Sequence, residues 1–146
     1  MKISAVIVAA GKGTRMGAEK NKVFLTLMGK TILEHTVTVF EKAQIIDEIV
    51  IVTNDIGECQ RLFSDYKKVV GIVPGGATRQ ESVRNGLMSV SGEFVAIHDG
   101  ARALICEKEI DASVSAAVKH GAAAVGVKSK DTLKKADGLG KNNRGS

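Results

Sequence analysis

A continuous apolar run that leads straight into a glycine-rich loop places the strongest limit on how this chain can fold. Residues Ile3 to Ala9 are apolar or small without a break, and glycines follow at positions 11, 13 and 17. A strand that is apolar on both sides is typical of a parallel sheet covered by helices on both faces. We therefore predict a buried strand that delivers the loop to one edge of a sheet.

The remainder of the chain alternates short apolar runs with stretches of helical periodicity. The runs predict further strands at residues 49–53, 69–73, 94–97 and 122–127. Helices are predicted from Thr31, over 55–66, from Thr78 and over 107–120, and Thr78 with Glu81 forms a capping-box signature. Five strands that alternate with helices predict an α/β fold: a three-layer, Rossmann-like, mostly parallel sheet with helices on both faces.

Polar or glycine-containing turns follow the first, third and fourth predicted strands. They are the loop that begins at Gly11, the turn Pro74-Gly75-Gly76 and the pair His98-Asp99. The carboxyl ends of parallel strands meet at one edge of a sheet, and ligands bind in the crevice beyond that edge. We expect the three turns to form a single site.

Length and composition indicate one compact domain. The chain has 146 residues, of which 44% are hydrophobic. Its two cysteines, Cys59 and Cys106, match neither a metal-binding spacing nor a disulfide framework, which favours a reducing compartment. The first apolar stretch is too short for a signal peptide, and no run is long enough to span a bilayer. We expect a soluble protein of the cytoplasm with no membrane partner.

Part of the net charge of +5 lies around the first glycines, where the basic residues Lys12, Arg15, Lys20, Lys22 and Lys30 are opposed by a single acid, Glu19. Aromatic residues, on which the bases of single-stranded nucleic acid stack, make up only 3% of the chain. A small polyphosphate is therefore a better ligand for this charge than a nucleic acid.

The glycine loop favours a nucleoside triphosphate. Gly11 and Gly13 lack a Cβ, so the backbone can turn tightly and offer N–H groups to phosphate oxygens, while Arg15 and Lys22 add positive charge. The spacing differs from the dinucleotide motif G-x-G-x-x-G, and Asp55 comes much later than the acid expected about 20 residues on, which disfavours a dehydrogenase. An ATPase loop, G-x-x-x-x-G-K-[ST], is also absent. We predict a nucleotidyltransferase-type domain.

Several segments resemble the 2-C-methyl-D-erythritol 4-phosphate cytidylyltransferases of the non-mevalonate isoprenoid pathway. The similarity covers residues 3 to about 135, and its segments are 9–17, 21–25, 32–36, 75–83, 98–102 and 130–132. The resemblance implies a nucleotide-diphospho-sugar transferase-like fold. It also implies transfer of CMP from CTP to methylerythritol phosphate, with release of pyrophosphate and with Mg²⁺ as the cofactor.

The resemblance further implies roles for individual residues. Arg15 and Lys22 match the family's transition-state stabilisers and are the expected catalytic residues. The nucleotide is expected to contact Ala9, Ala10, Gly11, Gly13, Gly76, Ala77, Ser82 and Gly100, with the base read largely by backbone groups. The acceptor substrate is expected at Arg79, Asp99, Arg102 and Thr132, and Asp99 is also expected to hold the metal through water.

Two features depart from the family pattern. Ala103 stands where the family usually has proline, which frees one backbone N–H and loosens the turn before it. The chain ends at Ser146, whereas family members continue into a projecting arm through which they form homodimers. We expect a nucleotidyltransferase domain over 1–135, truncated at its C-terminus relative to the family, and a loop or non-native tail over 136–146. The homodimer is expected for the longer members rather than for this chain.

Two other functions stay open at this point. A ribitol phosphate cytidylyltransferase shares the glycine loop, although the segments 75–79 and 100–102 favour methylerythritol phosphate as the acceptor. The second function is that of an inactive fragment, which binds CTP without turnover, because the arm of the longer family members would supply part of the active site.

Overall fold

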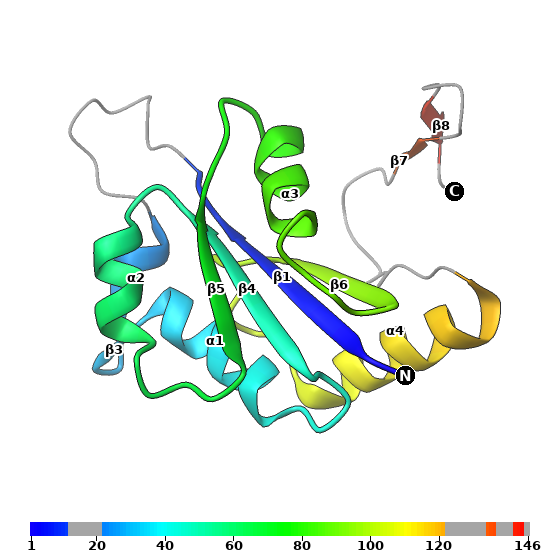
Figure 1. Ribbon diagram of the computed structural model, residues 1–146, viewed down its shortest axis with the longest axis horizontal. Helices are drawn as coiled ribbons and strands as arrows, with labels where there is room; N and C mark the ends of the chain where they lie inside the picture. Colours follow the sequence, from blue (N-terminus) through cyan, green and yellow to red (C-terminus); the bar gives the residue numbers. More distant parts are fainter. Residues whose placement is uncertain (12–21, 122–133, 137–141, 145–146) are drawn as a thin grey trace.

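A four-stranded parallel sheet forms the centre of the computed structural model, which describes residues 1–11, 22–121, 134–136 and 142–144. The strands are β1 (Ile3–Ala9), β4 (Glu48–Thr53), β5 (Val69–Pro74) and β6 (Phe94–Asp99), in the order β5-β4-β1-β6 (Figure 1). Every neighbouring pair is parallel. The predicted mostly parallel α/β sheet is confirmed, while the strand predicted at 122–127 lies outside the described residues.

Three of the four described α-helices begin at a residue whose side chain caps them. The helices are α1 (Ile32–Lys42), α2 (Ile56–Leu62), α3 (Arg79–Leu87) and α4 (Glu107–His120). The side chains of Thr31, Asp55 and Thr78 each accept a hydrogen bond from a backbone N–H in the first turn of α1, α2 and α3, which satisfies one of the free donors there. Helix α2 ends before the predicted residue 66, since Phe63 leaves the helical conformation and packs into the core. None of the described helices has the length and apolar character needed to cross a bilayer.

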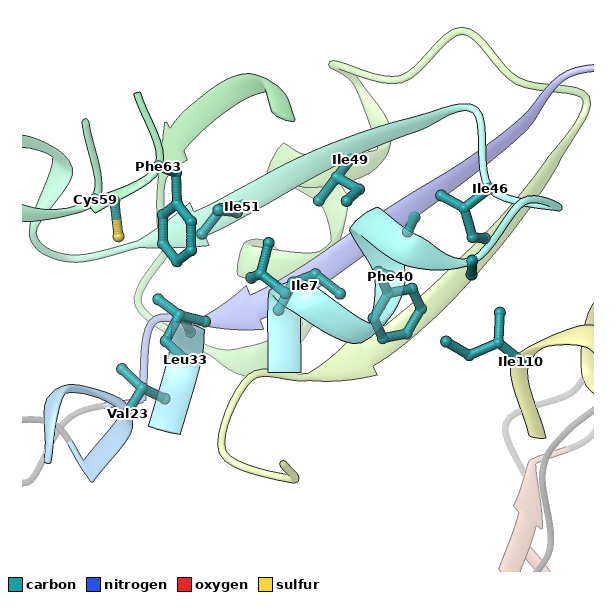
Figure 2. Close-up of a cluster of buried hydrophobic side chains, with 14 of the residues drawn as sticks. Ile7, Val23, Leu33, Phe40, Ile46, Ile49, Ile51, Cys59, Phe63 and Ile110 are labelled. Carbon is teal, nitrogen blue, oxygen red and sulfur yellow. The ribbon is translucent and has the colours of Figure 1, made fainter. Parts of the chain in front are cut away.

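The sheet is covered on both faces, as predicted. Figure 1 shows α3 on one side of the sheet and α1, α2 and α4 on the other. Alternate residues of β1 divide between two cores: Ile7 packs with the three-helix layer, whereas Val6 and Val8 face α3. The larger core includes Leu33, Phe40, Cys59, Phe63 and Ile110 (Figure 2). Burial on both faces explains why the first strand reads as a continuous apolar run.

Smaller elements complete the described residues. The 3₁₀ helix η2 (Lys22–Phe24) precedes a hairpin of β2 (Thr26–Leu27) and β3 (Lys30–Thr31). Farther on, β7 (Lys134–Ala136) pairs antiparallel with β8 (Asn142–Arg144). The sequence analysis predicted a loop or tail over 136–146. It predicted no strand there because strands of three residues are too short to produce a periodic signal. The domain boundary at residue 135 stays a prediction.

A buried carboxylate joins three segments at the amino ends of the strands. Glu48 is 5% exposed, and its oxygens accept hydrogen bonds from Ser4 Oγ at 2.6 Å and from the Ser91 backbone N–H at 2.7 Å. Lys2 Nζ lies 3.0 Å from the other oxygen. Burial by itself would raise the pKa of this carboxyl group, but the hydrogen bonds outweigh it and lower the pKa from 4.5 to about 2. The ionised form of Glu48 therefore stabilises the fold.

Replacing Glu48 by glutamine should destabilise the protein in a pH-dependent way. At neutral pH the loss should be about 1–3 kcal/mol, because buried donors lose a charged acceptor. The unfolded carboxyl group takes up its proton around pH 4.5, above the folded value of about 2, so its stabilising contribution is lost as the pH falls through this interval. Urea denaturation at neutral pH and at about pH 4 and pH 2 should show the wild-type advantage shrinking toward acid. A pH-independent difference would contradict this account, and the exposed Glu93→Gln is the matched control.

Candidate functional site

A cavity of about 490 Å³ opens at the carboxyl ends of β1, β5 and β6. Its lining consists of Val8, Ala10, Gly11, Gly76, Ala77, Thr78, Arg79, Ser82 and Asp99. These residues lie in the three turns that the sequence predicts to meet at one edge of the sheet, or in the ends of the strands and the helix that flank them. Most of them also belong to the site predicted for a nucleotide and its acceptor, so the fold brings that part of the predicted site together.

The first wall of the cavity is the turn between β5 and α3, residues 74–77. The N–H of Gly75 donates to Thr53 O at 3.1 Å, and that of Gly76 donates to Ser82 Oγ at 3.0 Å. The N–H of Ala77 donates to Glu81 Oε2 at 2.6 Å. Glu81 thus departs from the predicted capping box, since its carboxylate bonds the residue before the helix cap while Thr78 still caps α3. The turn is fixed by side chains of its own helix.

This wall approaches the first loop so closely that Gly75 has no room for a side chain. A Cβ on Gly75 would overlap the Cβ of Ala10 and would lie 2.9 Å from Asn54 Oδ1. Asn54, directly after β4, also donates from Nδ2 to the Ala10 carbonyl at 2.7 Å. The sequence analysis missed Asn54, although a polar residue immediately after a β-branched strand was a signal that could have found it. It links the carboxyl ends of β1, β4 and β5.

The second wall is the turn that follows β6. Asp99 lines the cavity, and its Oδ1 accepts the N–H of Ala101 at 3.0 Å. Gly100 is buried beneath the turn, where its N–H donates to Val8 O at 2.8 Å. His98 bonds the Arg102 carbonyl at 3.0 Å and packs against Phe40, with ring centroids 5.3 Å apart. His98 is therefore a packed and hydrogen-bonded residue of this wall.

Helix α1 supports this second wall through a buried hydrogen bond. Thr36, completely buried, donates from Oγ1 to the Gly100 carbonyl at 2.8 Å. At the start of the same helix, Thr31 and Glu34 form a reciprocal capping box, and His35 bonds the Leu27 carbonyl at 2.6 Å. The segment 32–36, singled out in the sequence without a role, therefore connects the hairpin to the Asp99 turn.

The remaining predicted residues lie outside this cavity or outside the described residues. Lys22 is exposed at the start of η2, which is anchored by the buried Val23. The Ala9 side chain packs in the larger core, and Arg102 is exposed and absent from the cavity lining. Three predicted residues, Gly13, Arg15 and Thr132, fall outside the described residues.

No metal cluster marks the described part of the chain, and its buried thiol is not reactive. No group of three or more metal-ligating side chains occurs among the residues that the structure describes. Burial raises the pKa of the Cys59 thiol to about 11, so this thiol stays protonated at neutral pH. Within the described lining of the cavity, Asp99 is the one carboxylate. A single carboxylate with phosphate oxygens suits Mg²⁺, which usually keeps several of its waters.

The sequence and the fold are both similar to known cytidylyltransferases. The model of the 2-C-methyl-D-erythritol 4-phosphate cytidylyltransferase family matches residues 3–142. Proteins of that name from Clostridium acetobutylicum and Geobacillus thermodenitrificans are 47% and 43% identical over 89% and 95% of this chain. The chain spans 59% and 63% of their lengths.

A similar fold occurs in the crystal structure of 4-diphosphocytidyl-2C-methyl-D-erythritol synthase from Anaerococcus prevotii. The two share 30% identity and a TM-score of 0.76, and the match covers 98% of this chain and 62% of that one. The match therefore includes the four-stranded sheet that the structure describes.

Adding a methyl group at Gly75 should separate the first loop from the β5 turn. Gly75→Ala is expected to destabilise the protein by about 1–3 kcal/mol, because the Ala10 side chain that it would meet is already packed in the smaller core. Gly57→Ala in the exposed first turn of α2 is the matched control, since a Cβ there meets nothing closer than 4.0 Å. The control should be neutral or more stable by up to about 1 kcal/mol. Equal effects of the two substitutions in urea denaturation would show that close packing at Gly75 is unimportant.

Proposed function

The chain belongs to the 2-C-methyl-D-erythritol 4-phosphate cytidylyltransferase family, and from this we propose that it takes part in transferring CMP from CTP to 2-C-methyl-D-erythritol 4-phosphate, a step of isoprenoid precursor synthesis. The observation that carries the proposal is the cavity that joins the first loop, the Gly76–Ala77 wall and Asp99. A nucleoside triphosphate needs a base-sized wall beside a loop that can hold phosphates, and these three segments supply both.

The proposed reaction is an in-line substitution at phosphorus. An oxygen of the acceptor's phosphate attacks the α-phosphorus of CTP, while the bond from that phosphorus to the bridging oxygen of the leaving pyrophosphate breaks. Negative charge grows on the five-coordinate centre and on the leaving group, so fixed cations stabilise the transition state more than a general base does. We assign this role to Arg15 and Lys22. Lys22 is exposed at the start of η2, next to the buried Val23, so its charge is accessible to a ligand.

The nucleotide is proposed to lie along the cavity from its backbone wall to the glycine loop. Ser82, 3% exposed, keeps its own hydroxyl hydrogen after accepting from Gly76, which leaves one donor for a base. The loop at Gly11 and Gly13 would hold the phosphates. Arg79, Arg102 and Thr132 are assigned to the acceptor, together with Asp99.

Asp99 would hold a hydrated Mg²⁺, which when bound neutralises charge on the phosphates. One carboxylate oxygen of Asp99 accepts the Ala101 N–H, so the second oxygen is the one proposed to bind the hydrated Mg²⁺.

We place the reaction in the cytoplasm. The two cysteines of the described residues, buried Cys59 and exposed Cys106, are both free, as in a reducing compartment. Formation of a homodimer is proposed only for the full-length protein.

The proposal is tested by measuring pyrophosphate release with CTP, Mg²⁺ and methylerythritol phosphate, alongside calorimetric titration with CTP. Turnover that is faster with methylerythritol phosphate than with ribitol phosphate supports it. The reverse preference would favour the ribitol phosphate enzyme. Binding of CTP without turnover would identify a nucleotide-binding fragment, and no binding of CTP would overturn the proposal.

Loss of either proposed catalytic cation should slow the reaction strongly. Arg15→Ala and Lys22→Ala are each expected to lower kcat by roughly 10²-fold, by analogy with removing one preorganised donor, with a smaller effect on CTP affinity. Single-turnover measurements separate the two effects. Lys119→Ala, at the exposed end of α4, is the control and should retain wild-type turnover. An undiminished rate in either variant would remove that residue from the mechanism.

A further inference from the structure

The buried hydroxyl of Thr36 forms a hydrogen bond that its own helix does not require. A threonine inside a helix can satisfy its hydroxyl with the carbonyl four residues earlier, and Thr36 Oγ1 does lie 3.2 Å from Ile32 O. The shorter bond, at 2.8 Å, instead joins Oγ1 to the carbonyl of Gly100, 64 residues away. Thr36 is completely buried, so this donor serves the Asp99 turn and not the solvent.

One planar peptide group connects this hydroxyl to the Asp99 carboxylate. The peptide between Gly100 and Ala101 accepts the Thr36 hydroxyl at its carbonyl and donates its N–H to Asp99 Oδ1 at 3.0 Å. This peptide is trans, so its C=O and N–H point in opposite directions in one rigid plane, and fixing one end fixes the other. Thr36 therefore acts on the orientation of a carboxylate that lines the cavity.

Other contacts fix the position of Gly100 but not the rotation of the peptide that follows it. The Gly100 N–H donates to Val8 O at 2.8 Å, which attaches the preceding peptide to β1. On its other side, Leu33 Cδ1 would lie only 2.9 Å from a Cβ at this position. Gly100 lacks that Cβ, so its backbone alone restrains the next peptide weakly. The Thr36 bond supplies the restraint.

Helix α1 also carries the segment of the proposed catalytic cation. Val23, directly after Lys22, packs with Leu33 in the larger core, where the two side chains lie close together (Figure 2). The first turns of one helix therefore support the Lys22 segment and, through Thr36, the Asp99 turn. A carboxylate aimed from this helix keeps a defined relation to the Lys22 segment.

We propose that Thr36 is a positioning residue, which aims the second oxygen of the Asp99 carboxylate into the cavity through the Gly100–Ala101 peptide. This inference rests on the proposed function, in that Asp99 must act on the acceptor side of the reaction, directly or through Mg²⁺. Thr36 does not line the cavity, so its effect on a ligand passes through the turn.

The test compares binding of CMP with binding of the expected product, in which CMP is joined to methylerythritol phosphate. Calorimetry with Mg²⁺ but without pyrophosphate measures both affinities with no reaction taking place. The extra affinity of the product over CMP reports the acceptor side. Thr36→Val should reduce this extra affinity by about tenfold and change the Kd of CMP by less than about twofold, as expected for one lost buried hydrogen bond. Thr36→Ala removes the same hydroxyl with different packing and should give the same loss.

Two further variants separate the hydrogen bond from packing. Thr36→Ser keeps the hydroxyl and should retain the extra affinity within about threefold of wild type. Thr38, in the same helix, bonds the Tyr66 hydroxyl at 2.8 Å and lies outside the cavity lining. Thr38→Val therefore loses a side-chain hydrogen bond of α1 and should leave the extra affinity unchanged. Thermal unfolding of each variant measures the purely structural effect of the substitution.

A double variant tests whether Thr36 acts through Asp99. Asp99→Ala removes the carboxylate that Thr36 is proposed to aim, so adding Thr36→Val should weaken product binding no further. Residues that act in one chain of contacts are non-additive in this way, whereas independent effects add. A general weakening of the fold would reduce product binding equally in both backgrounds.

Several outcomes would overturn the assignment of Thr36. They are an unchanged extra affinity in Thr36→Val and Thr36→Ala, an equal loss of CMP and product, failure of Thr36→Ser to retain the extra affinity, and additivity with Asp99→Ala. A wild-type chain that binds the product no more tightly than CMP would also overturn it. Failure of the wild-type chain to bind either nucleotide would instead overturn the proposed function, on which this inference depends.

Discussion

Burial of β1 on both faces is the constraint from which the rest of the structure follows. The strand lies between β4 and β6, and its alternate residues supply both hydrophobic cores. An apolar pattern on two faces does not by itself select one register, since a shift of one residue still buries apolar side chains. The buried pair Ser4 and Glu48 supplies the missing selectivity, because a shifted strand would leave the carboxylate without its partners.

The same central strand places the candidate site. Parallel strands bring their carboxyl ends to one edge, and small residues there allow the loops to approach each other closely. Gly75 contacts Ala10, and Gly100 lies under the Asp99 turn with Leu33 Cδ1 only 2.9 Å from where a Cβ would be. The cavity is therefore walled largely by backbone and by short side chains.

Sequence patterns predicted the elements well but predicted long-range contacts poorly. Strand and helix positions follow from periodicity and capping, which are local, and three turns were correctly expected at one edge of the sheet. Thr36 and Asn54 were missed, since their partners Gly100 and Ala10 are distant in sequence, although the place of Asn54 directly after a β-branched strand was a local signal. Glu81 was recognised as a capping residue, but its bond to Ala77 depends on the path of the turn. The roles of Arg15 and Thr132, outside the described residues, stay predictions.

The two walls of the cavity are attached to opposite layers of the fold. The turn at 74–77 is held by α3, on one face of the sheet, whereas the Asp99 turn is held through Thr36 by α1, on the other. The sheet between them is closely packed on both sides and resists deformation. A change in α3 therefore acts directly on the turn at 74–77, whereas a change in α1 acts directly on the Asp99 turn. The two walls thus share one cavity but have different supports.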